Sequence, residues 1–571
     1  MRLRRVGLCC VILAFVAQAC ALDREAFSFT KYDLDLQVEP AQQRLGARGT
    51  VTLRNDSAAP QKVAVLQISS SLTWHSIKAN GKQLQFVSQP YTSDIDHTGA
   101  LSEAVVTLPE AIPPKGTTTL EIAYEGVIVL DATRFTRIGA PEAMALSNDW
   151  DQISPKFTAV RGVGNVAWYP TAEQDVDLSE SSALAEALQR WRSRELDAEM
   201  TLRITVANAD WEEKPEFLIN ASNCPKALEV REGFAATCNY QSFAAVTPAF
   251  IIAGYDVIER AAIAVHFLPG HDTAASAYAD AAEKVQPFIG EWFGAARNKA
   301  QVADLADASA VASESGSFLM TPLVIVDSKQ LGLMAAHQLT HAAFFSRRPW
   351  MNEGLAHFAQ ALYVERTSGR QGALDYMKAH TSTIGGQDKT EGAHSDTAMR
   401  DSLINTAEEQ TYRSKGMYVW WMLRDMVGDA VVKKALASYR AEDDKEPSYM
   451  QRLLQAQTSK DLEWFFDDWV YRERGLPDFK VESAFSRKTL PEGYMLTVTV
   501  SNAGDAGAEV PLTVKFTGGE VTKRLIVRGK SNAVIRVETP QAPDEIIVND
   551  GSVPESDETN NRFKVVNATA N

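Results

Sequence analysis

Two neighbouring segments decide how this chain folds: His337-Gln338-Leu339-Thr340-His341, and Trp-Met-Asn-Glu-Gly-Leu-Ala at residues 350–356. The first segment lies in an apolar run with helical spacing, so its two histidines fall on one helix face, one turn apart. Imidazoles in that arrangement can both reach one tetrahedral metal ion. Pro349 cannot continue the helix, so a second helix starts there and folds back, presenting Glu353 to the histidines.

The three side chains form the ligand set of a predicted metal site. A catalytic zinc ion needs three protein ligands and an open position for water. We therefore predict that zinc binds His337, His341 and Glu353. The alternative is a pair of histidines that only pack on a buried helix. The intervening turn and the Asn-Glu-Gly run favour the metal site, because they return a carboxylate to the histidine pair.

The His-x-x-x-His pair followed by a helix with Asn-Glu-Gly-x-Ala resembles the gluzincin zinc metallopeptidases, in particular the aminopeptidase N family. Tyr412-Arg413-Ser414-Lys415-Gly416 is similar to that family's tyrosine segment, which also runs into Lys-Gly. The resemblance implies that Tyr412 stabilises an oxyanion. Ala312-Ser313-Glu314-Ser315 weakly resembles the family's Ala-Met-Glu-Asn segment, which implies that Glu314 binds the substrate's free amino group. The resemblance covers roughly residues 27–475 and implies an aminopeptidase that acts on peptides or proteins.

Two departures from the family pattern concern this same site. Eleven residues separate His341 from Glu353, a shorter gap than the family has, which shortens the loop that lines the pocket. The residue after His337 is Gln338, where the family has its catalytic glutamate. That carboxylate takes a proton from the zinc-bound water and passes it to the leaving amine. A neutral amide cannot hold the proton, and the loss of general acid–base catalysis costs roughly 10²- to 10⁴-fold in rate.

Gln338 leaves three interpretations open. It is native and defines a peptide-binding or chemically altered relative, it was introduced to trap a substrate, or another carboxylate, Glu314, acts as the base. One functional hypothesis is a zinc metallopeptidase of the aminopeptidase type, impaired by Gln338. The alternative is a catalytically inactive peptide-binding or cell-envelope interaction protein on the same scaffold. A purely structural cell-envelope protein with a vestigial helical domain is the third hypothesis.

Hydrophobic periodicity divides the chain into the three domains of a multidomain α+β protein. Period-two alternation, as in Tyr32–Val38, predicts an N-terminal β-sheet domain at residues 24–260. Helical spacing predicts a mostly helical catalytic domain at residues 261–475, which the resemblance makes thermolysin-like. Alternation returns afterwards and predicts a C-terminal β-sandwich at residues 477–571. Within the central domain we predict helices at residues 274–293, 331–345, 350–367, 372–383 and 415–427, and a strand at residues 319–326.

Composition and charge restrict the partners. The formal net charge is −16 and the pI is about 5.2. A net-acidic chain repels phosphate backbones, which argues against nucleic acid as a partner. A peptide or protein substrate is the partner that the predicted site implies. The sequence does not indicate an oligomeric state.

The N-terminus predicts export. Three arginines among the first five residues precede an apolar run, Leu8–Ala19, which predicts a signal peptide at residues 1–21 and a periplasmic or secreted protein. The alternatives that involve a membrane are an uncleaved anchor and a lipoprotein site at Cys20. In an oxidising compartment we expect Cys224 and Cys238 to form a disulfide, the alternative being two free thiols.

Overall fold

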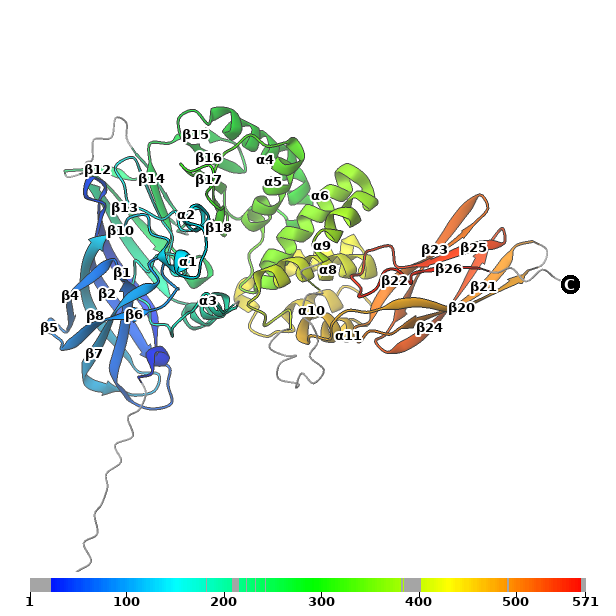
Figure 1. The fold of residues 1–571 in the computed structure, drawn as a ribbon, viewed down its shortest axis with the longest axis horizontal. Coiled ribbons are helices and arrows are strands. Elements are labelled where there is room, and N and C mark those ends of the chain that lie inside the picture. The colour runs from blue at the N-terminus through cyan, green and yellow to red at the C-terminus, as the bar shows by residue number, and fades with distance from the viewer. Residues whose placement is uncertain are drawn as a thin grey trace, which may run out of the picture.

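The computed structural model describes residues 22–565, apart from residues 181, 208–214, 222, 232, 242, 382–383, 385–401 and 490–491. Figure 1 shows β-sheets at the amino-terminal end, helices in the middle and further sheets at the carboxyl-terminal end. The predicted multidomain α+β fold is confirmed. The predicted signal peptide, residues 1–21, lies outside the described residues. None of the described helices is long and apolar enough to cross a membrane.

The described residues of the amino-terminal region form three sheets and three α-helices. Its elements are β1 (Phe27–Glu39), β2 (Arg44–Asn55), β3 (Gln61–Ser69), β4 (Leu72–Ala79), β5 (Lys82–Gln83), β6 (Phe86–Thr92), β7 (Ala100–Ile112), β8 (Thr117–Val127), α1 (Thr133–Arg137), α2 (Glu142–Asn148), β9 (Phe157–Val160), α3 (Ala183–Glu195), β10 (Glu199–Ala207), β11 (Glu216–Ile219), β12 (Leu228–Val230), β13 (Gly233–Tyr240) and β14 (Phe250–Ala253). The largest sheet has the order β12-β13-β10-β1-β2-β8-β4-β5, and two three-stranded sheets have the orders β3-β7-β6 and β11-β14-β9. In β1, Tyr32, Leu34, Leu36 and Val38 are buried, as the period-two alternation predicts.

A disulfide joins Cys224 to Cys238 of β13. Cys238 is buried and belongs to the amino-terminal core, and Cys224 packs against that core. The predicted pairing of these two cysteines is confirmed. The bond holds the chain before β12 against the edge of the eight-stranded sheet.

The central region combines a mixed sheet with a helical layer. Its elements are β15 (Asp256–Glu259), β16 (Ile263–Phe267), α4 (Asp272–Phe293), β17 (Ala300–Asp304), β18 (Ser313–Ser315), β19 (Phe318–Thr321), α5 (Ser328–Ala343), α6 (Pro349–Lys378), α8 (Glu409–Val427), α9 (Asp429–Ser438), α10 (Tyr449–Gln455) and α11 (Glu463–Phe466). The sheet has the order β15-β16-β17-β19-β18, which makes β18 an edge strand. Since β15 pairs with β16, the first strand of this sheet starts at Asp256.

The sequence predicted one strand here, at residues 319–326, and missed the other four. The strand is also shorter than predicted, since β19 ends at Thr321. Pro322 has no N–H for a ladder, and the next amide, of Leu323, donates to the Asp304 carboxylate at 2.8 Å. The missed strands are only three to five residues long, too short for a clear period-two signal.

The predicted helices correspond to α4, α5, α6 and α8, although α8 begins at Glu409, earlier than the predicted residue 415. The two helices predicted at residues 350–367 and 372–383 both lie in α6, where non-helical backbone at Gly369, whose φ is 76°, separates them. Glycine tolerates that backbone angle. Thr383, the end of the second predicted helix, lies outside the described residues.

The carboxyl-terminal region contains two antiparallel sheets. Its strands are β20 (Phe479–Lys488), β21 (Tyr494–Asn502), β22 (Ala508–Phe516), β23 (Gly519–Val527), β24 (Ser531–Thr539), β25 (Pro543–Val548) and β26 (Arg562–Lys564). One sheet has the order β20-β21-β24 and the other β23-β22-β25-β26. Their inner side chains, such as Val498 and Val514, belong to the same buried cluster as the central helices, so this region packs directly on them.

A smaller buried cluster joins the amino-terminal and central regions. It combines Phe157 and Ile251 from the sheet β11-β14-β9 with Ala303, Phe318 and Met320 from β17 and β19. The mixed sheet that carries β18 is therefore fixed against the amino-terminal region by apolar packing.

A buried carboxyl group anchors α3 to the amino-terminal sheet. Tyr32 and Trp191 donate hydrogen bonds to Glu195 Oε2 at 3.1 and 3.0 Å. Burial raises the pKa of Glu195 to about 7 from an ordinary value of 4.5. The folded protein therefore binds this proton more tightly than the unfolded chain does.

We expect the protein to lose stability as pH rises from 4.5 to 7, since the unfolded chain releases the Glu195 proton first. The loss attributable to this group is roughly 3 kcal/mol. Glu195→Gln removes the titration, so the fall in free energy of unfolding between pH 5 and pH 8 should shrink by that amount in chemical denaturation. Glu186→Gln, an exposed position on the same helix, is the control. Equal pH dependence in both variants would contradict the assignment.

Candidate functional site

The two histidines of α5 face each other. Asp327 caps the helix by accepting a hydrogen bond from the Gln330 amide at 2.9 Å. The His337 and His341 Nε2 atoms lie 3.2 Å apart, as their spacing of one turn predicts. The side chain of His341 is 2% exposed and that of His337 is 12% exposed.

Glu353 reaches the histidine pair from α6. Its Oε1 lies 3.5 Å from His341 Nε2, and its Oε2 lies 3.7 Å from His337 Nε2. Proline at the first position of α6 starts this second helix, as the sequence predicts. Asn352 Nδ2 lies 3.2 Å from His341 Nδ1, so the far nitrogen of that ring also has a polar neighbour. Such outer contacts fix the orientation of a metal-binding imidazole.

Glu314, on the edge strand β18, belongs to the same cluster. Its Oε1 lies 2.9 Å from His337 Nε2 and 4.0 Å from His341 Nε2. One ligand atom from each of Glu314, His337, His341 and Glu353 lies within 4.8 Å of the others. The predicted role of Glu314 in amine binding is not tested by this geometry.

These residues fit a zinc ion. Bonds of about 2.1 Å in a tetrahedron place the ligand atoms roughly 3.4 Å apart. The contacts among His337, His341 and Glu353 span 3.2 to 3.7 Å. Imidazole nitrogens and carboxylate oxygens are ligands that zinc accepts. When bound there, zinc supplies a Lewis acid and lowers the pKa of a coordinated water.

Arg413 is the site residue that the sequence analysis missed. Its Nε lies 3.2 Å from Glu353 Oε2, and its Nη2 lies 3.3 Å from Glu314 Oε1. The same Nη2 lies 2.6 Å from Glu409. The guanidinium thus bridges the two carboxylates of the cluster and orients both. Its position directly after Tyr412, in the segment already singled out, is the only signal that the sequence offered.

Tyr412, next to Arg413 on α8, lines the same cavity as Glu353, and its oxyanion role stays a prediction. Residues one apart on a helix point about 100° apart, so Tyr412 and Arg413 cannot occupy the same place. Among the described residues, no hydrogen bond to the Tyr412 hydroxyl is found. The ring lines the neighbouring cavity, and burial raises the pKa of its hydroxyl.

Gln338 points into the core. The Tyr278 hydroxyl of α4 donates to Gln338 Oε1 at 2.7 Å, and Gln338 Nε2 donates to the Gln301 carbonyl at 2.8 Å. The residue is 2% exposed. It is absent from the described lining of the cavity beside the cluster. The amide therefore satisfies a buried donor and a buried acceptor, a pair of bonds that a carboxylate could not make.

Two glycines let α6 and α8 cross at close range. A Cβ on Gly416 would lie 2.9 Å from the Gly354 Cα, and a Cβ on Gly354 would lie 3.0 Å from the Gly416 Cα. Glycine at both positions is what allows this approach. Because Glu353 precedes Gly354 and Arg413 lies one turn before Gly416, the crossing brings the guanidinium to the carboxylate.

Charge pairing sets the protonation of the cluster. Burial lowers the pKa of His341. Burial opposes charge on His337 as well, but the adjacent Glu314 carboxylate outweighs it and raises the pKa of His337. The same contact overcomes the effect of burial on Glu314 and holds the pKa of that carboxyl well below its usual range. Since a metal binds neutral imidazole, metal affinity falls as pH falls.

A cavity of about 510 Å³ lies beside the cluster, between the amino-terminal and central regions. Its lining includes Arg192 of α3 and Arg347 before α6, and also Glu314, Glu353 and Glu409. Both charge signs therefore face one space next to the candidate metal site.

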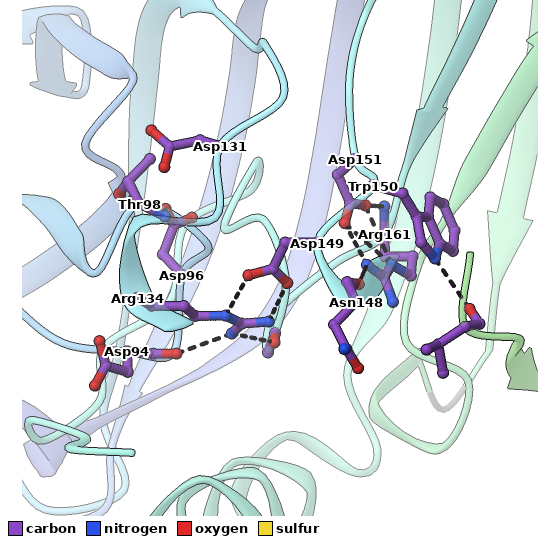
Figure 2. A network of polar contacts seen from close by, with 12 residues as sticks. Asp94, Asp96, Thr98, Asp131, Arg134, Asn148, Asp149, Trp150, Asp151 and Arg161 are labelled. Carbon is purple, nitrogen blue, oxygen red and sulfur yellow. Dashed lines mark hydrogen bonds and ion pairs between the residues drawn. The ribbon is translucent and has the colours of Figure 1, made fainter. Parts of the chain in front are cut away.

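Two ion pairs build the amino-terminal wall of this cavity (Figure 2). Arg134 donates to both Asp149 oxygens, at 2.5 and 2.8 Å. Arg161 donates to Asp151 Oδ2 at 2.6 Å and lies over the Trp150 ring, 3.8 Å from its centroid. These carboxylates are fully buried, so each needs its guanidinium partner.

The same wall holds the chain that leads into β18. Trp150 Nε1 donates to the Val311 carbonyl at 3.0 Å, and the Val311 amide donates to the Ser147 carbonyl at 2.7 Å. Val311 comes three residues before Glu314. The position of this carboxylate therefore depends on contacts with the amino-terminal region.

Comparison with known proteins identifies part of the chain. The family model described as peptidase family M1 domain matches residues 347–469, from the start of α6 to beyond α11. This segment is therefore similar to the M1 peptidase family. It contains Glu353, Tyr412 and Arg413, whereas the two histidines of α5 precede it.

Solved structures and curated proteins complete the comparison. An M1 zinc metallopeptidase from Deinococcus radiodurans has 16% identity and a TM-score of 0.49, over 79% of this chain and 96% of that chain. A mutant M1 zinc metallopeptidase from the same organism, bound to a Tyr-Ser-Ala substrate, has 17% identity and a TM-score of 0.48 over the same shares. Among curated proteins, no match is found. Residues 347–469 thus resemble an M1 peptidase domain, and the chain carries a His/Glu cluster suited to a metal.

We expect about one zinc ion per purified chain, as a single site requires, measured by elemental analysis. His341→Ala should lose the metal because it removes a ligand from the middle of the cluster. His75→Ala should keep the metal, because this half-exposed histidine pairs with Glu125 in the amino-terminal region and does not belong to the cluster. Equal metal content in both variants would place the zinc elsewhere.

Gly416→Ala should destabilise the protein by about 1–3 kcal/mol, since the added methyl group overpacks the helix crossing. It should also weaken zinc binding by displacing Arg413 from Glu353. The matched control is Gly290→Ala in α4, where an added Cβ meets nothing within 4 Å and should stabilise the helix slightly. Denaturant titration and metal competition measure the two effects. Similar behaviour of the two variants would show that the crossing tolerates a side chain.

Proposed function

We propose that this protein is an exported, zinc-containing relative of M1 peptidases that binds peptides without hydrolysing them. The observation that carries the proposal is Gln338. Its side chain is uncharged and is hydrogen-bonded to Tyr278 and Gln301, so it neither holds a proton nor faces the cavity. Export rests on the sequence of residues 1–21 alone.

Peptide binding is supported by the cavity. A short peptide carries a positive amino terminus and a negative carboxyl terminus. The Glu409 carboxylate, which lines the cavity, suits the first, and the guanidinium groups of Arg192 and Arg347, which also line it, suit the second. The structural neighbour bound to Tyr-Ser-Ala makes a tripeptide of that kind the natural probe.

The second candidate is an impaired aminopeptidase, which the match of residues 347–469 to the M1 family model favours. In that case zinc-bound water would attack the amino-terminal peptide bond, Tyr412 would stabilise the oxyanion, and only the general base would be missing. The two candidates differ in what restoring the carboxylate at position 338 would do.

We expect no turnover of amino-acid anilides above background by the wild-type protein, and none by Gln338→Glu. The new carboxylate would face the Gln301 carbonyl in the core, where it cannot reach substrate. A rise of about 10²- to 10⁴-fold, the range of general acid–base catalysis, would instead establish the aminopeptidase and overturn the binding proposal.

Calorimetric titration with Tyr-Ser-Ala tests binding directly. We expect the free tripeptide to bind and the N-acetylated, C-amidated form to bind at least about tenfold more weakly, because both terminal charges are lost. Arg192→Ala should weaken binding of the free tripeptide, while Arg190→Ala, an exposed arginine on the same helix that pairs with Glu25, should not. Absence of binding by the zinc-loaded wild-type chain would refute the peptide-binding function.

A further inference from the structure

The carboxylate of Glu314 is as close to the histidine pair as that of Glu353. From His337 Nε2 and His341 Nε2, the Glu314 oxygen lies at 2.9 and 4.0 Å, and the nearest Glu353 oxygens lie at 3.7 and 3.5 Å. One ligand atom from each of the four side chains lies within 4.8 Å of the other three. The distances to the two histidines therefore do not distinguish Glu353 of α6 from Glu314 of the edge strand β18.

Three independent contacts hold Glu314 in this place. β18 pairs with β19, with Glu314 opposite Leu319. The chain before it is fixed by the bonds of Val311 to Trp150 and Ser147. Arg413 contacts the same Oε1 that faces His337. The carboxylate therefore needs no rearrangement of the backbone to meet a metal.

We propose that Glu314 is a fourth zinc ligand, so that the site is closed, with two imidazoles and two carboxylates and no open position for water. This inference rests on the zinc binding of the proposed function. The two carboxylates neutralise the charge of the ion, and Arg413 orients both from outside. A zinc ion with four protein ligands is characteristic of structural sites, whereas catalytic sites keep one position open.

A closed site explains the direction of the Gln338 side chain. Gln338 does not face the metal, and a site with no coordinated water has no proton for a base at that position to take. The metal would instead tie β18, α5 and α6 together beside the cavity. Peptides would then be held by the charged walls of the cavity and not by the ion.

Cobalt(II) substitution tests the coordination sphere without relying on activity. The full chain is stripped with a chelator, loaded with Co²⁺ and titrated with azide while its visible absorption is recorded. In the wild-type protein we expect no spectral change. Glu314→Ala opens a position, so azide should shift the spectrum. Glu409→Ala, which removes another carboxylate in contact with Arg413, should behave as the wild type does.

Zinc affinity gives a second readout. Removing an outer-sphere partner typically costs 10- to 100-fold in metal affinity, so loss of a ligand through Glu314→Gln should cost more than about 100-fold in competition with a chromogenic chelator. Glu409→Gln should cost less than about tenfold. An azide-dependent spectrum in the wild-type protein, or a Glu314→Gln affinity within about tenfold of wild type, would overturn the fourth-ligand assignment while zinc binding stands.

These experiments distinguish failure of the fourth-ligand inference from failure of the proposed function. A wild-type chain that takes up neither Co²⁺ nor Zn²⁺ would refute the metal site itself, and the fourth ligand with it. If Glu314 instead anchors a peptide amino group, Glu314→Gln should weaken binding of free Tyr-Ser-Ala and leave zinc affinity unchanged, which also overturns the assignment. The azide titration of the wild-type protein needs no variant, so a folding defect in the variants does not remove the test.

Discussion

The close crossing of α6 and α8 is the constraint on which the site depends. Side chains normally keep helix axes about 8–10 Å apart, and a pair of facing glycines removes that spacer at the place where Gly354 meets Gly416. Backbone contact there decides which residue of α8 reaches Glu353. The bridge from Arg413 to the two carboxylates, and the charge balance of the cluster, follow from it.

The parts of the site that obey local rules were predictable from sequence. Helical periodicity and one proline were enough to bring Glu353 back to His337 and His341. The contact of Arg413 with Glu353 and Glu314 was not predictable, because periodicity gives the face of a helix but not its rotation against a neighbour. That rotation is set by Gly354 and Gly416, whose mutual contact no local pattern reveals.

Long-range contacts account for the other differences. The sequence showed that Gln338 lacks a basic group, but its direction depends on Tyr278, sixty residues earlier in α4. The short strands around β19 carry too few residues to show alternation. They form because neighbouring strands of the sheet offer them hydrogen-bonding partners. The position of Glu314 on β18 depends on Trp150, in another region of the chain. The long elements were predictable because they carry enough residues to show a period. The short strands and the directions of single side chains depend on residues far away in the sequence.

The hydrogen bond from Trp150 to Val311 has one more consequence. Three of the cluster's side chains come from two consecutive helices, whereas Glu314 is aligned by a partner in the amino-terminal region. A metal held by all four would respond to the alignment of the two regions, so its occupancy would report interdomain assembly. A tight metal site could therefore form only after the two regions have docked, so the protein would bind the ion at the end of folding.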